Sequence, residues 1–122
     1  MLEWQNLNVW KESHRLTLEI YRLAQRFPDE ERFRLRDQMC RCASSVAANI
    51  VEGHARHSKR EYIQFLYIAR GSAEESRYHL LLDKDLGYIK NEQCEELDNS
   101  YIKVSKMLNA LITSLRRKDA IS

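Results

Sequence analysis

Residues that interrupt secondary structure are almost absent from this chain. Its 122 residues include only three glycines and one proline, the two residue types that most often mark turns and breaks. Few interruptions imply few and long elements, and a charged share of 31% is what long helices with wide polar faces produce. The chain is therefore predicted to be all-α.

Apolar residues recur every three or four positions in four segments, at about residues 8–26, 32–53, 58–86 and 91–117. This period places them on one face of a helix. Pro28 cannot continue the first helix, and Gly53 suits a left-handed C-terminal cap of the second. Ser58 and Glu61 form a capping box for the third. The pattern predicts an antiparallel up-down four-helix bundle with short loops, built as one domain over residues 1–122.

Charge and hydropathy exclude several classes of protein. The net charge is +2, which argues against a strongly basic nucleic-acid binder but permits a local basic patch. No apolar run approaches the roughly 20 residues that span a bilayer. The first residues, "MLEWQNLNVWKES", lack the pattern of a signal peptide. We therefore expect a cytoplasmic protein with no membrane partner.

The cysteines point to no cofactor. Cys40, Cys42 and Cys94 form no C-x-x-C pair and no zinc-type spacing with histidine. Cys40 and Cys42 project about 200° apart on a helix, so they cannot bind one metal together. We expect reduced, partly buried thiols, with no metal and no cofactor.

Two rows of polar residues flank the apolar faces of the second and third helices. The rows, called the polar seam below, consist of Ser45, Asn49, Glu52, Ser72, Glu75 and His79. If these helices are antiparallel neighbours, the rows meet near the core. One interpretation is a hydrogen-bond network that fixes helix register. The alternative is a metal or acid/base site formed by Glu52, Glu75 and His79. Because Glu75 and His79 are four apart rather than three, the pattern favours the network.

The stretch "NIVEGHARHSKREY", residues 49–62, is locally basic. It holds Arg56, Lys59 and Arg60 without an acid between His54 and Arg60, and the first part of the predicted second helix adds further arginines. The candidates for phosphate contacts are Arg34, Arg36, Arg41, Arg56, Lys59 and Arg60. Cations at the start of the third helix oppose its dipole, which favours an anionic partner. The alternative is a solvated charged corner between two helices.

Several aromatic and aliphatic residues lie off the main apolar stripes. The candidates for a subunit interface are Trp10, Tyr21, Ile63, Tyr67, Tyr78 and Leu81. A four-helix monomer has little room to bury a second apolar face on each helix. These residues therefore favour a homo-oligomer, although neighbouring long side chains could instead cover the rings.

Four stretches carry a family resemblance: "VW" at the start of the first helix, "RLRDQMCRCASSVAANIVEG", "ARHSKREYIQFLYIARGS" and "LLDKDLGYI". The most specific positions are Asn49, Ile50, Glu52, Gly53, Arg56, Glu61, Phe65, Leu66, Ala69, Gly71, Ser72 and Glu75. On these residues the chain resembles the four-helix-bundle family of 23S rRNA intervening-sequence proteins, from about Val9 to Leu115. It is also similar to the accessory protein of diversity-generating retroelements.

The resemblance implies a fold more than an activity. The family has no assigned catalytic function. The retroelement relative forms a pentameric barrel and associates with a reverse transcriptase and nucleic acid through basic surfaces. By that analogy this chain is expected to be a homopentamer, in which five weak basic corners act together.

The function predicted from the sequence is that of a non-enzymatic oligomeric scaffold that contacts RNA or DNA phosphates. The chain has no Gly-rich phosphate loop, nucleophile elbow or recognisable Cys–His pair, so we expect no enzyme. A protein-interaction module that binds no nucleic acid is the first alternative. A metal-dependent enzyme in the bundle core is the second.

Overall fold

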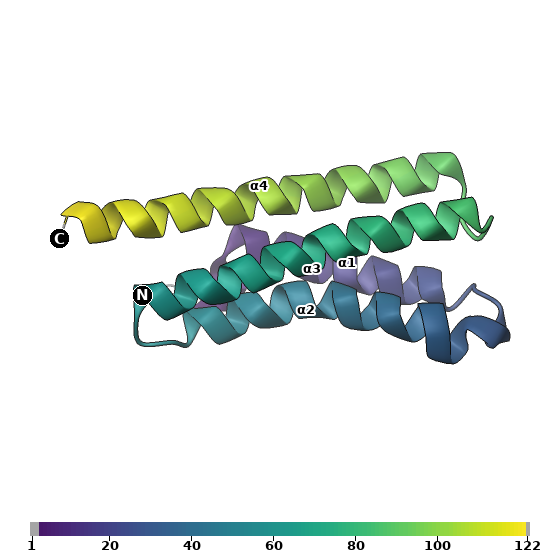
Figure 1. Cartoon of the computed structure of the whole chain (residues 1–122), viewed down its shortest axis with the longest axis horizontal. Coiled ribbons are helices and arrows are strands. Elements are labelled where there is room, and N and C mark those ends of the chain that lie inside the picture. The colour runs from purple at the N-terminus through teal and green to yellow at the C-terminus, as the bar shows by residue number, and fades with distance from the viewer. Residues whose placement is uncertain (1–2, 122) are drawn as a thin grey trace.

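A computed structural model describes residues 3–121, without the side chains of residues 32 and 118–121. Four long helices form the chain: α1 (Asn8–Ala24), α2 (Asp37–His54), α3 (Lys59–Asp85) and α4 (Asn91–Ile121). They run alternately up and down (Figure 1), and the described residues contain no strand. The predicted all-α four-helix fold is confirmed. Within residues 3–121, no helix combines the length and hydrophobicity needed to cross a membrane.

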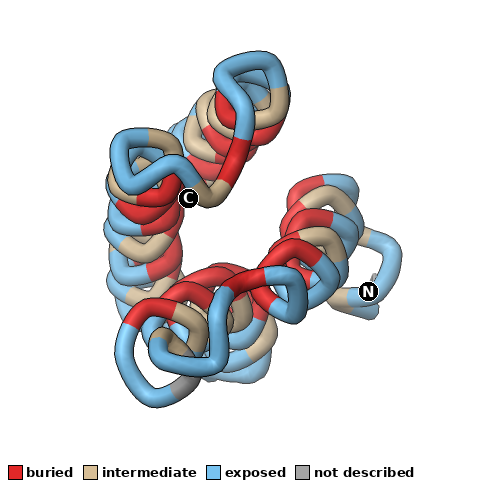
Figure 2. The backbone as a smooth tube through the Cα atoms, turned by 90° about the vertical axis from the view of Figure 1, so that its right-hand side faces the viewer, coloured by how far each residue is buried: buried red, intermediate tan, exposed pale blue. Residues whose placement is uncertain are grey.

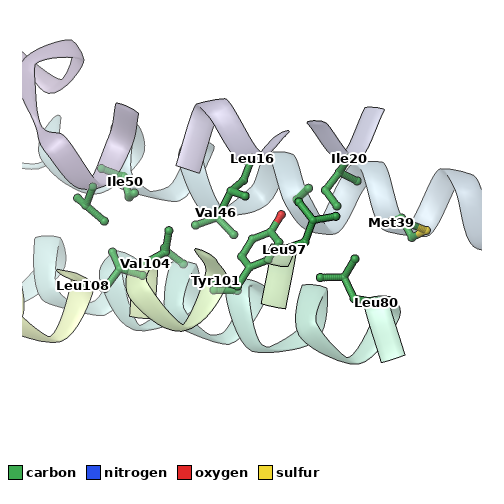
Figure 3. Close-up of a cluster of buried hydrophobic side chains, with 14 of the residues drawn as sticks. Leu16, Ile20, Met39, Val46, Ile50, Leu80, Leu97, Tyr101, Val104 and Leu108 are labelled. Atoms are coloured by element: carbon green, nitrogen blue, oxygen red, sulfur yellow. The ribbon is translucent and has the colours of Figure 1, made fainter. Parts of the chain in front are cut away.

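The apolar stripes meet along the axis of the bundle. Seen nearly along the helices, buried positions face inward and exposed positions face outward (Figure 2). Side chains from all four helices interdigitate in the core, as Figure 3 shows for Leu16, Ile20, Met39, Val46, Ile50, Leu80, Leu97, Tyr101, Val104 and Leu108. This shared core explains why α1 to α4 pack as one unit, since each helix buries its stripe only against the others.

The connection between α1 and α2 is more structured than the sequence predicted. α1 ends at Ala24, and a 3₁₀ turn (Asp29–Glu31) and a π-helical turn (Arg32–Arg36) precede α2. Pro28 explains the break, because it disfavours helical backbone at the preceding residue. The regular part of α2 thus begins at Asp37, five residues later than predicted.

Gly53 and Gly87 have different structural roles. Gly87 has a φ of 83°, and the amides of Gly87 and Tyr88 bond the carbonyls of Lys84 and Asp83 in a left-handed cap of α3. Gly53 instead lies inside α2 without positive φ, so the predicted left-handed cap there was wrong. A Cβ on Gly53 would stand 2.8 Å from Phe65 Cβ, so this glycine permits close contact between α2 and α3.

The predicted start of α3 is confirmed. Ser58 is the N-cap, and its Oγ accepts a hydrogen bond of 3.1 Å from the amide of Glu61. This bond satisfies one of the amides that a helix start leaves without an intrahelical partner. The corner between α2 and α3 is therefore only four residues long.

A ladder of polar contacts joins α3 to α4. Arg77 donates to Asp98 at 2.7 Å and Arg70 donates to Asn109 at 2.8 Å. Arg116 donates to the Tyr67 hydroxyl. Because the partners in α3 run backwards as those in α4 run forwards, the ladder fixes an antiparallel register. It also places the last turns of α4 beside the start of α3.

Candidate functional site

The polar seam forms between α2 and α3. Ser45 and Ser72 share a hydrogen bond of 2.9 Å across the two helices. The Asn49 amide donates to the Ser45 carbonyl at 2.8 Å and to its hydroxyl at 2.9 Å. The structure thus brings together Ser45, Asn49 and Ser72 in a network that can set the register of α2 against α3.

Glu52 does not belong to this network. Its side chain is exposed and pairs with Arg56 at 3.2 Å. It lies seven residues beyond Ser45 on α2, about 10 Å along the helix axis. The sequence-based alternative of a metal or acid/base site built on Glu52, Glu75 and His79 is therefore wrong in its first member.

Cys42, rather than Glu52, is the side chain that lies beside Glu75 and His79. Its thiol lies 3.2 Å from the Ser72 carbonyl and 3.4 Å from Glu75 Oε2, and it accepts a bond from Ser76 at 3.4 Å. The sequence predicted only a reduced, partly buried thiol at Cys42, so this role was missed. The available signal was the Glu75–His79 pair on the facing helix.

Burial governs the protonation of this cluster. It raises the pKa of the Cys42 thiol to about 11, while Ser76 lowers that pKa slightly and Glu75 raises it. Burial also lowers the pKa of His79, against the opposing effect of Glu75. At neutral pH the cluster therefore holds a protonated thiol and a neutral imidazole. A protonated thiol is a poor nucleophile.

The cluster lines an open groove of about 410 Å³. One ligand atom from each of Cys42, Glu75 and His79 lies within 4.8 Å of the others. Gln38 and Arg41 form part of the rim. In the part of the chain that the structure describes, these three side chains are the group that could hold a metal ion.

The basic corner after α2 is partly neutralised. Arg56 pairs with Glu52 and its guanidinium lies 4.7 Å from the centre of the Phe65 ring. Lys59 is half-buried and Arg60 is exposed. His54 packs edge-on against Tyr62, with ring centres 5.8 Å apart. Residues 54–60 contain no acid, but Glu52 lies four residues before Arg56 and forms an ion pair with it.

The other predicted phosphate contacts lie elsewhere. Arg34, Arg36 and Arg41 lie at or near the start of α2, whose 18 residues span about 27 Å. They pair with Glu31 at 3.4 Å, Asp29 at 3.8 Å and Asp37 at 3.0 Å. The structure therefore does not bring the six candidate cations into one patch.

The last turns of α4 add cations that the sequence reading did not include. The α2–α3 corner and the C-terminal part of α4 lie at the same end of the bundle (Figure 1). Arg116 reaches Tyr67 of α3, and Arg117 next to it is exposed. We call the end formed by the α2–α3 corner and the last turns of α4 the corner end. The opposite end, formed by residues 28–36 and the α3–α4 turn, is called the turn end.

The predicted interface residues differ in exposure. Ile63 is buried in the monomer core, so it was wrongly assigned to a surface. Trp10 stacks on His14 with ring centres 4.9 Å apart and also contacts Trp4. Tyr67 is flanked by Arg70 and Arg116. Tyr21, Tyr78 and Leu81 stay exposed, and Tyr78 has 58% of its surface accessible.

Comparisons with known proteins agree with this architecture. The family model described as 23S rRNA-intervening sequence protein matches residues 5–110. A solved structure from Bacteroides thetaiotaomicron VPI-5482, described as a protein with unknown function from the S23 ribosomal protein family, is 30% identical. The match covers 86% of this chain and 95% of that chain, with a TM-score of 0.80. No curated protein matches the sequence.

Proposed function

Because the chain belongs to the 23S rRNA-intervening sequence protein family, we propose that it is a non-enzymatic protein that binds RNA or DNA phosphates through its corner end. Cations from two distant parts of the sequence support this role. Arg56, Lys59 and Arg60 come from the α2–α3 corner, and Arg116 and Arg117 come from the last turns of α4. Phosphate contacts of this kind carry affinity without sequence specificity.

The start of α3 adds a second attraction for anions. Lys59 and Arg60 occupy its first turn, where the positive end of the helix dipole makes further cations unfavourable. A bound phosphate would offset that repulsion and could also accept bonds from the amides at the helix start. At the turn end, Arg34 and Arg36 pair with Glu31 and Asp29, as Arg56 pairs with Glu52 at the corner end.

The non-enzymatic part of the proposal rests on the polar seam. The thiol beside it, that of Cys42, is held protonated by burial. The Ser45 hydroxyl bonds that of Ser72 and accepts a bond from the Asn49 amide. A nucleophile needs a base positioned to remove its proton, and Ser45 bonds only to Ser72 and Asn49 in the hydrogen bonds found among residues 3–121.

Binding of a structured RNA across a salt series tests the proposal. We expect the triple variant R56Q/K59Q/R60Q to bind more weakly and to lower the slope of log K against log salt by about 1 to 3. The matched control is R34Q/R36Q/R41Q, which removes the same charge from the other end of α2. We expect this control to keep the wild-type slope. Equal effects of the two triples, or no effect of the corner triple, would contradict the proposal.

A second candidate function is self-association without nucleic acid. It is favoured by exposed apolar side chains on α1 and α3, where Tyr21, Tyr78 and Leu81 stay in solvent. We propose that a second copy of the chain covers them, and the resemblance to the retroelement accessory protein makes five the expected subunit number. Native mass spectrometry of nuclease-treated protein tests this proposal. We expect an oligomer that Y78E/L81E converts to monomer, whereas a monomeric wild-type protein would contradict it.

A further inference from the structure

A thiol, a carboxylate and an imidazole meet in the groove between α2 and α3. Cys42 projects from α2, and Glu75 and His79 project from α3. Residues four apart on a helix lie on the same face, one turn from each other. Glu75 and His79 therefore point the same way, and Cys42 faces them from the neighbouring helix with its sulfur 3.4 Å from Glu75 Oε2.

The spacing of the three donors suits a small metal ion. Their ligand atoms lie within 4.8 Å of one another. A tetrahedral zinc site with bonds of about 2.0 to 2.3 Å separates its ligand atoms by roughly 3.5 Å. The ligand atoms must therefore move about 1 Å closer to one another. Rotation of the side chains of exposed Glu75 and of buried Cys42 and His79 can supply this movement.

His79 gives an independent indication of a missing partner. Only 8% of the residue is exposed. Its Nδ1 atom is fully buried and finds no hydrogen-bond partner among residues 3–121. Buried polar atoms are nearly always paired, so this nitrogen needs an explanation. A neutral imidazole beside a thiol and a carboxylate is also the form that binds metals.

We propose that Cys42, Glu75 and His79 bind one zinc ion, which links α2 to α3. Sulfur and imidazole ligands select zinc over magnesium or calcium, which prefer oxygen. Three protein ligands leave a fourth position, directed toward the groove lined by Gln38 and Arg41. A solvent water completes the tetrahedron there. On binding, the Cys42 thiol releases its proton to solvent and its sulfur bonds the metal as a thiolate.

The site is separate from the proposed phosphate contacts. Cys42 lies fourteen residues before Arg56 along α2 and the following corner, which corresponds to about 20 Å in a helix. Loss of phosphate binding would therefore leave the zinc proposal unaffected, and the reverse also holds. The second place for adventitious zinc is the corner, where His54 ends α2 and His57 follows it.

Metal titration of the full chain tests the proposal. The protein is prepared without a histidine tag, treated with a chelator and kept reduced. Zn²⁺ binding is then measured by calorimetry, and Co²⁺ binding by the thiolate-to-cobalt charge-transfer absorption. We expect one ion per chain, a thiolate band with Co²⁺ and a rise in Tm with Zn²⁺.

Variants locate the ion. C42S should abolish the thiolate band, and H79Q and E75Q should each weaken Zn²⁺ binding at least tenfold. Two controls should keep wild-type binding: C94S, which removes the buried thiol that contacts the Leu80 carbonyl, and H54Q/H57Q. Circular dichroism checks that each variant is folded. If C42S does not fold, E75Q carries the test, because Glu75 is exposed.

Three results would overturn the proposal. The first is the absence of stoichiometric Zn²⁺ binding to the wild-type chain. The second is wild-type binding by folded H79Q and E75Q. The third is loss of binding in H54Q/H57Q, which would place the ion at the corner.

Discussion

The two ends of the bundle carry similar numbers of cations, but the ion pairs of these cations differ. At the turn end, Arg34 and Arg36 find carboxylates on the adjacent 3₁₀ turn. At the corner end, Glu52 pairs with Arg56, while Arg60 and Arg117 are exposed. The comparison teaches that a basic stretch in a sequence indicates an anion-binding surface only after the carboxylates near it in the folded chain are known.

The backbones of the two ends also differ. The corner end is regular, since α2 continues through Gly53 and α3 begins on the Ser58 cap. The turn end combines a 3₁₀ turn, a π-helical turn and the left-handed Gly87. It also buries Asp83 completely, with both carboxylate oxygens lacking a partner among the described residues.

The largest expected effect concerns Asp83. Burial, together with the charge of Glu31, raises the pKa of Asp83 to about 7 from 3.8. Between these values the folded protein keeps a proton that the unfolded chain has lost. The free energy of unfolding should therefore fall as pH rises from about 4 to 7. D83N should remove this slope and stabilise the protein by about 2 to 3 kcal/mol at pH 8.

Urea unfolding of both proteins between pH 4 and 8 measures this effect. D85N is the matched control, because Asp85 is exposed two residues away. If the free energy of unfolding of D83N depends on pH as that of the wild type does, the pKa of Asp83 is not raised in the folded protein.

The next effect concerns the close contact at the corner end. G53A would place a Cβ 2.8 Å from Phe65 Cβ and 2.9 Å from Tyr62 Cδ1. The resulting shift of the helices should cost about 2 kcal/mol, even after the better helix propensity of alanine. G71A is the control, since nothing lies within 4 Å of its Cβ. It should stabilise by about 0.5 to 1 kcal/mol.

Thermal unfolding compares these two glycine variants. A G53A protein as stable as G71A would mean that α2 and α3 can separate at the corner without cost.

A smaller effect is expected at the Ser58 cap. S58A removes the acceptor for the Glu61 amide and should destabilise the protein by about 1 kcal/mol. S105A, which removes an exposed hydroxyl 3.4 Å from Glu74, should stay within about 0.5 kcal/mol of wild type. Denaturant midpoints at equal m-values measure both changes. Equal midpoints for the two variants would show that the Ser58 cap does not stabilise the protein.

The regular parts of the fold could be predicted from the sequence. Apolar periodicity located four helices, and Ser58 marked one helix start, because both signals are local. The turn end escaped prediction, since a π-helical turn at Arg32–Arg36 lies where the apolar period had predicted a regular helix. Gly53 was misassigned for a related reason: a glycine needed for helix contact looks the same in sequence as one needed for positive φ.

The sites were less predictable than the fold. The rows containing Ser45 and Ser72 were found by spacing. Cys42 was predicted only as a partly buried thiol, because its neighbours on α3 are distant in sequence. Arg116 was missed for the same reason, since its place beside Tyr67 depends on the register of α4. Ile63 shows the opposite error, because the monomer already buries it.

Backbone hydrogen–deuterium exchange with and without a structured RNA tests the central claim most directly, because it reports both ends in one experiment. The account predicts slower exchange on RNA binding in residues 52–64 and 110–117 at the corner end. It predicts unchanged exchange in residues 28–37 and 84–91 at the turn end. Slower exchange at the turn end with an unchanged corner end would contradict the account.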